Sequence, residues 1–115
     1  MTPQERRRQL IHARDLFNAG EYWLAHEALE TVWRSIIETE EKRVWQGLIQ
    51  SAAALLHSRR GNRHGAVVTG GRALAKLAGP QVAAVEFDTV TFRADLARAL
   101  AGQGDSPQLE FRTNG

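Results

Sequence analysis

Residues 25–33 read AHEALETVW and place an imidazole and a carboxylate one helical turn apart. Residues four positions apart on a helix are offset by about 40° and lie on the same face. His26 and Glu30 can therefore point at one place, either as two ligands of a metal ion or as a carboxylate that orients an imidazole. The spacing is not the HExxH pattern of zinc proteases, because Glu30 stands where the second histidine would be.

Two ligands on one helix make only half of a metal site, so further donors must come from another element. The next helical stretch supplies His57. If the two helices pack antiparallel, the end of the second approaches the beginning of the first, where His26 lies. We therefore predict a site in which His26, Glu30 and His57 hold a divalent metal ion or a small ligand. The residues expected to line this site are Glu27, Gln50, Trp33 and Asn62.

The same residues also have a purely structural interpretation. His26 and Glu30 could hydrogen-bond each other or the ends of neighbouring helices, and so hold the helices in register. The three tryptophans, Trp23, Trp33 and Trp45, are predicted to be core anchors. A buried, mutually satisfied trio with no cavity would favour this structural interpretation. A trio that converges on a cavity open to solvent would favour a functional site.

The elements that must position these residues are helices. Apolar residues recur at helical spacing, and no strand-like alternation stands out, so the sequence predicts an all-α fold. We expect a compact bundle of four to five short helices with tetratricopeptide-like hairpin packing. The expected helices span about 3–19, 21–37, 40–60, 62–77 and 89–101. Val67 and Val90 are predicted to face inward on the last two helices. Residues 1–102 are expected to form one domain, and the Gly-, Pro- and polar-rich residues 103–115 a mobile tail.

Composition narrows the class of protein. The chain has 115 residues, of which 43% are hydrophobic and 24% charged, as in an ordinary globular domain. The absence of cysteine excludes disulfides and thiolate metal sites. No apolar run approaches the ~20 residues of a membrane span, and the basic start lacks the features of a secretory signal. The expected location is the cytoplasm. The net charge of +2 is weak evidence for an acidic partner, and a homodimer remains open.

Two stretches of the sequence resemble a known family. FNAGEYWLAHEALETVWR (17–34) and WQGLIQSAAALLHSRRGNRHGA (45–66) look like the bacterial and archaeal family catalogued as domain of unknown function 309. Its HxxxExxW motif is met by His26, Glu30 and Trp33. The second block matches at Gln46, Gly47, Leu48, His57, Gly61 and Asn62. The resemblance implies an all-helical domain whose motif has been suggested to bind metal, with no established activity.

Two other classes of function remain open. GEYWLAHEALETVW also resembles the second helix of a tetratricopeptide-like hairpin, which suggests a helical interaction module, although a full set of repeats is missing. The segment SRRGNRHG (58–65) gathers basic side chains at a turn before a helix, which could hold the phosphates of a nucleic acid. A charge run of this kind is more typical of a solvated turn, so nucleic-acid binding is the weakest of the three.

Overall fold

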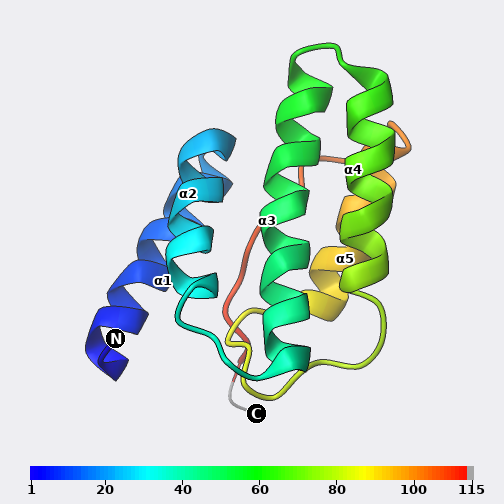
Figure 1. Ribbon diagram of the computed structural model, residues 1–115. Helices are drawn as coiled ribbons and strands as arrows, with labels where there is room; N and C mark the ends of the chain where they lie inside the picture. Colours follow the sequence, from blue (N-terminus) through cyan, green and yellow to red (C-terminus); the bar gives the residue numbers. More distant parts are fainter. Residues whose placement is uncertain (114–115) are drawn as a thin grey trace.

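The computed structural model describes residues 1–113, and over this range the chain forms five helices (Figure 1). They are α1 (Pro3–Asn18), α2 (Tyr22–Trp33), α3 (Thr39–Arg59), α4 (Arg63–Lys76) and α5 (Thr89–Leu100). The only strand-like pairing among these residues is an isolated antiparallel bridge between Phe87 and Phe111. The predicted all-α fold is therefore confirmed. Within the same range, no helix is both long and apolar enough to cross a membrane.

Helix α3 is the central element of the fold. Figure 1 shows it between α2 and α4, with α1 on the far side of α2 and α5 behind α4. Consecutive helices pack as hairpins, so α2 and α3 run antiparallel as expected. Small residues allow the close packing: a Cβ added at Gly47 would lie 2.9 Å from Cγ of Leu77. The faces of α3 that meet its two neighbours are fully buried, as Trp45 and Ala52 illustrate.

The helix starts follow local capping chemistry. Thr2 and Glu5 form a capping box at α1, and the side chain of Asp88 accepts a hydrogen bond from the Thr91 amide at α5. Glu38 caps α3, and the backbone N–H groups of Glu41 and then Glu40 lower the pKa of its carboxyl. Because the pKa is lowered, the Glu38 cap stabilises the fold at a pH above the pKa of this carboxyl in the unfolded chain. This stabilisation is lost as the pH falls through the pKa of the folded state.

Helix α2 is shorter than the sequence predicted. It ends at Trp33 rather than near Ile37, and the chain tightens through a hydrogen bond from the Ile36 amide to the Trp33 carbonyl. Ile36 turns inward and is buried, whereas Ile37 is 95% exposed. Of these two neighbouring isoleucines, one lies in the core and the other on the surface. Helical periodicity alone does not predict which of them is buried.

The inward positions predicted for Val67 and Val90 are wrong. These side chains are 60% and 50% exposed. On α4 the contact with α5 falls at Gly70, where an added Cβ would lie 2.5 Å from Cδ1 of Leu100. On α5 the core position is taken by Phe92, whose ring packs edge-on against Phe17. The inner face of α4 is formed by Ala66, Gly70 and Ala73 and that of α5 by Thr89, Phe92 and Leu96, and neither face includes the valine.

The segment expected to be a mobile tail packs against the core in its described part. Leu109 is fully buried, and its backbone N–H and C=O both bond the side chain of Asn18, at 2.7 and 2.9 Å. The Phe111 ring packs 4.8 Å from that of Phe87. Pro107, Leu109 and Phe111 alternate with polar residues, so an extended segment turns its apolar side inward. This alternation in the sequence is a signal that the segment packs. Residues 114–115 of the expected tail lie outside the described residues.

A buried carboxylate ties three parts of the chain together. Glu41 is 9% exposed, and its Oε2 accepts hydrogen bonds from Nε1 of the fully buried Trp45 at 2.9 Å and from Nη2 of Arg6 at 3.0 Å. Arg6 also donates its Nε to Glu86 at 2.7 Å. The hydrogen bonds of Glu86 and then of Glu41 raise the pKa of the Arg6 guanidinium. The network joins α1 and α3 to the segment before α5.

Replacing Arg6 is expected to destabilise the fold. Arg6→Met leaves the buried Glu41 carboxylate with one donor fewer, so we expect the free energy of unfolding to fall by about 2 kcal/mol. Arg8→Met is the matched control, because Arg8 is exposed and makes no ion pair with residues 1–113. Urea unfolding of both variants measures the difference. An equal loss in the two variants would contradict the role given to Arg6.

Candidate functional site

The structure places His26 and Glu30 side by side on α2, as their spacing predicted. Their side chains are 20% and 32% exposed, so both lie at the edge between core and solvent. Nδ1 of His26 is 3.6 Å from Oε1 of Glu30. That separation is too long for a hydrogen bond. The pair is therefore close enough to interact electrostatically, yet neither group uses the other to satisfy its hydrogen-bonding capacity.

Side chains of the same helix hold the pair in place. The indole of Trp23 stacks on the imidazole of His26, with ring centroids 5.4 Å apart and planes 7° from parallel. Trp23 is 56% exposed, so the expectation that it anchors the core is wrong. It covers the imidazole instead. On the other side, Nη2 of Arg34 bonds Oε2 of Glu30 at 3.0 Å and leaves Oε1 turned toward His26.

Two nitrogen atoms of this helix are buried without a hydrogen-bond partner. They are Nδ1 of His26 and Nε1 of Trp33, and no other side-chain polar atom described in the structure shares this condition. An unsatisfied buried polar group costs about 1–3 kcal/mol. Since Nδ1 is enclosed and a fifth of the His26 side chain is exposed, Nε2 is the ring nitrogen that an external molecule can reach. Nε2 of His26 can therefore accept a hydrogen bond or a proton.

The structure does not bring His57 to this pair. His57 lies at the end of α3, where its Nδ1 is 3.1 Å from Nδ2 of Asn62, and it packs against the start of α4 near Gly65. The residue of that turn that meets α2 is Arg59, which lies over the Tyr22 ring. Two residues along a helix correspond to a rotation of about 200°, so His57 faces away from α2.

No complete metal site forms within residues 1–113. Over that range there is no group of three or more His, Cys, Asp or Glu side chains that could hold a metal ion. His26 and Glu30 supply two donors, which is half of the usual complement. The donor set of the described chain therefore does not fit a resident metal ion by itself.

The other residues predicted to line the site are dispersed. Oε1 of Gln50 accepts a hydrogen bond from Nζ of Lys76 at 3.0 Å, which ties α3 to α4. Glu27 is exposed and lines a shallow groove of about 420 Å³ between α1 and α2. Trp33 is the last residue of α2, and Nζ of Lys42 lies 4.8 Å from the centre of its ring. Asn62 caps α4, where its Oδ1 accepts from the Gly65 amide.

Sequence reasoning missed three residues around the pair. Trp23 precedes His26 by three positions, and Arg34 follows Glu30 by four. Both spacings place side chains on one helix face, so the i,i+3 and i,i+4 rule was a usable signal for them. Lys42 comes from α3 and reaches Trp33 across the α2–α3 hairpin. Its contact depends on the turn at residues 34–38, for which the sequence offered no signal.

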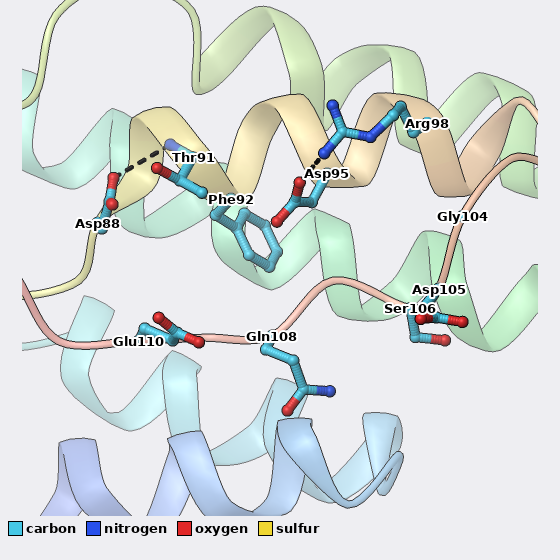
Figure 2. Close-up of a pocket in the computed structure, with 10 residues that line it drawn as sticks. All are labelled: Asp88, Thr91, Phe92, Asp95, Arg98, Gly104, Asp105, Ser106, Gln108 and Glu110. Atoms are coloured by element: carbon cyan, nitrogen blue, oxygen red, sulfur yellow. Dashed lines mark hydrogen bonds and ion pairs between the residues drawn. The ribbon is translucent and has the colours of Figure 1, made fainter.

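A separate cleft of about 340 Å³ lies between α5 and the segment 104–110 (Figure 2). None of the predicted site residues lines it. Four carboxylates stand on its walls, from Asp88, Asp95, Asp105 and Glu110. Figure 2 shows two of them already engaged: Asp88 accepts from the Thr91 amide, and Asp95 pairs with Arg98. These two carboxylates serve the structure of α5.

Comparison with known proteins identifies the family. Residues 10–69, just over half of the chain, match the family described as "Domain of unknown function (DUF309)". The chain belongs to the DUF309 family. The resemblance read from its two sequence blocks is thus confirmed. The matched range contains both members of the α2 pair and also His57, so the candidate site lies inside the DUF309 region.

Two relatives of this DUF309 chain are described only as uncharacterised proteins. The chain is 46% identical over 46 residues to "Uncharacterized protein YpuF" of Bacillus subtilis (strain 168), a match covering 40% of this chain and 26% of that protein. It is 40% identical over 53 residues to an "Uncharacterized protein" of Aquifex aeolicus (strain VF5), covering 46% of this chain and 16% of the other. The chain therefore aligns with about a quarter of one relative's length and about a sixth of the other's.

The geometry predicts which nitrogen of His26 carries the proton when the ring is neutral. A carboxylate accepts hydrogen bonds and cannot donate them, so Oε1 of Glu30 favours a proton on the facing Nδ1. We expect the Nδ1–H tautomer in the DUF309 chain and a loss of that preference in Glu30→Gln. Long-range ¹H–¹⁵N NMR of the imidazole distinguishes the two tautomers. An Nε2–H tautomer in the unmodified chain would contradict the orientation described above.

Proposed function

We propose that this DUF309 protein binds a small polar ligand through His26 and Glu30. The observation that carries the proposal is the unsatisfied Nδ1 of His26, next to a carboxylate that does not bond it. A pair whose role was only to hold helices together would satisfy its own hydrogen bonds, because that is how a buried polar network stabilises a fold. Here the imidazole is held in position by Trp23 and its bonding capacity is left unused.

The ligand chemistry follows from the atoms that are available. Nε2 of His26 is an acceptor when Nδ1 carries the proton, and Oε1 of Glu30 is an acceptor without a hydrogen bond of its own. Two neighbouring acceptors suit a molecule with two hydrogen-bond donors, such as a small amine or a polyol. With a hydrolysable ligand, Nε2 is also the atom that takes a proton from an attacking water, as a general base.

A divalent metal ion is the second ligand class that the pair supports. Nitrogen and carboxylate oxygen are donors that Zn²⁺ accepts, but two donors leave an ion with half of its coordination unfilled. We propose that a metal binds here only where a bound small molecule or another protein chain completes the coordination. Under this proposal Zn²⁺ alone binds weakly, and a chelating molecule raises its affinity.

A titration followed at His26 itself tests the proposal. The untagged protein, labelled with ¹⁵N in its histidines, is titrated with ZnCl₂ and, separately, with a panel of small amines and polyols. We expect a saturable shift of the His26 imidazole signals with at least one probe. His26→Ala and Glu30→Gln should each weaken binding of that probe about tenfold or more, since each removes one of two polar contacts.

His64→Ala is the matched control, because His64 is exposed at the start of α4 and lies outside the α2 pair. It should leave the affinity of the responding probe unchanged. A response to an amine or polyol without metal assigns a small-molecule ligand, and a response to Zn²⁺ assigns a metal. The proposal is overturned if His26 responds to no probe, or if His64→Ala weakens binding as much as His26→Ala does.

One observation favours a second candidate function, a helical interaction module. Large apolar side chains are exposed on both sides of the His26–Glu30 pair, with Trp23 56% and Ile37 95% exposed. Exposed tryptophan is enriched among the residues that dominate protein interfaces. If this surface docks a protein, Ile37→Ala should weaken capture of that partner and leave the His26 titration unchanged, because no contact joins Ile37 to His26 or Glu30 in the described chain. The two functions are therefore separated by which substitution removes binding.

A further inference from the structure

A small cleft lies where the start of α2, the end of α3 and the segment 104–106 meet. Its volume is about 190 Å³, and its polar lining comes from Tyr22, Ser58, Arg59 and Ser106. His26 and Glu30 do not line it, so it is separate from the site of the proposed function. We propose that this cleft binds a small oxyanion, such as phosphate or the phosphoryl group of a small metabolite.

Tyr22 provides a buried polar group that opens into the cleft. The residue is 5% exposed, and its ring packs edge-on against Phe17 at 5.3 Å. Its hydroxyl bonds no atom in the described part of the chain. Yet the hydroxyl is not one of the two side-chain atoms that are fully buried without a partner, which are Nδ1 of His26 and Nε1 of Trp33. The hydroxyl must therefore keep access to solvent, and the cleft that Tyr22 lines supplies that access. A buried tyrosine normally finds a partner for its hydroxyl.

Arg59 places a fixed positive charge on the same cleft. Its Nη1 donates to the backbone carbonyl of Gly20, and its guanidinium carbon lies 4.7 Å from the centre of the Tyr22 ring. No carboxylate side chain within residues 1–113 forms an ion pair with it. A guanidinium has five N–H donors, so most of them remain for a ligand. These contacts hold the side chain ready without neutralising its charge.

The donor set matches an oxyanion. The guanidinium can bond two oxygens of one phosphate or carboxylate in parallel. The hydroxyls of Tyr22, Ser58 and Ser106 can each donate to a remaining oxygen. A metal cation is a poor match, because the only charged group on the cleft is positive.

Two features of the cleft repel an anion, so one residue must supply most of the attraction. Ser58 and Arg59 belong to the last turn of α3, and Ala99 belongs to the last turn of α5. Both helix C-termini carry partial negative charge. The neighbouring acidic cleft of Figure 2 shares Gly104 and Ser106 with this one. The attraction must then come from the guanidinium, so removing Arg59 should cost more affinity than removing the Tyr22 hydroxyl.

The test uses the full chain and inorganic phosphate. ¹H–¹⁵N NMR spectra are recorded as sodium phosphate replaces sodium chloride at constant ionic strength. We expect saturable shifts at the amides of Tyr22 and Ser106 and at Nε of Arg59. Arg59→Gln should weaken phosphate binding about tenfold or more, and Tyr22→Phe about threefold, as expected for a charged and a neutral hydrogen bond. Tyr22→Phe keeps the ring in the core and so guards against loss of the fold.

Arg60→Gln is the matched control. Arg60 is the next residue, is exposed, carries the same charge and does not line this cleft. It should change the affinity less than about twofold, and His26→Ala should also leave phosphate binding intact. Shifts that never saturate, or an equal effect of Arg60→Gln and Arg59→Gln, would show only diffuse attraction of an anion to a basic surface and would overturn the proposal. A failed titration of His26 with amines, polyols or Zn²⁺ has no bearing on this result.

Discussion

The position of α3 depends on the hydrogen bond from Arg6 of α1 to Glu41, a carboxylate that also accepts a hydrogen bond from the indole of Trp45. The indole is fully buried and the carboxylate nearly so, which makes their bond and the one from Arg6 costly to break. Through these bonds the first turn of α1 and the segment at Glu86 are fixed to the start of α3. Helix α3 in turn packs against both α2 and α4. The orientation of α2, and with it that of His26, follows from this anchored centre.

The candidate site differs from the rest of the molecule in how its polar groups are used. Glu41 and Asn18 are satisfied by specific partners, and each joins segments far apart in the sequence. His26 is held by stacking and by packing, and its buried ring nitrogen bonds nothing in the described chain. Stability is given up at this position. Residues that lower stability without a structural return are typical of functional sites.

Local spacing made part of this arrangement predictable. The facing of His26 and Glu30 follows from one helical turn, and the caps at Thr2 and Asp88 follow from side chains that bond nearby amides. The predicted approach of His57 to His26 does not occur, and spacing along the chain could not decide it, because it depends on how α3 is rotated about its axis. Arg59 turned out to be the residue that meets α2.

Two further features of the structure could not be read from hydrophobicity or composition. Trp23 was expected in the core, since hydrophobicity does not reveal that a neighbouring imidazole offers a stacking surface. The chain after residue 102 was expected to be mobile because of its glycines and polar residues, although Pro107 and Leu109 are buried. The Trp23 stack is an i,i+3 contact within α2, and the packing of Leu109 is a tertiary contact. Hydrophobic composition alone indicates neither of them.

The stability of His26→Leu tests the central claim most directly. Leucine has a similar size, keeps the packing beneath Trp23 and removes the unsatisfied nitrogen. If His26 is retained for binding, urea unfolding should show His26→Leu to be as stable as the unmodified chain or more stable, by up to about 1 kcal/mol. A loss of more than about 1 kcal/mol would contradict the account, because it would show that the imidazole stabilises the fold.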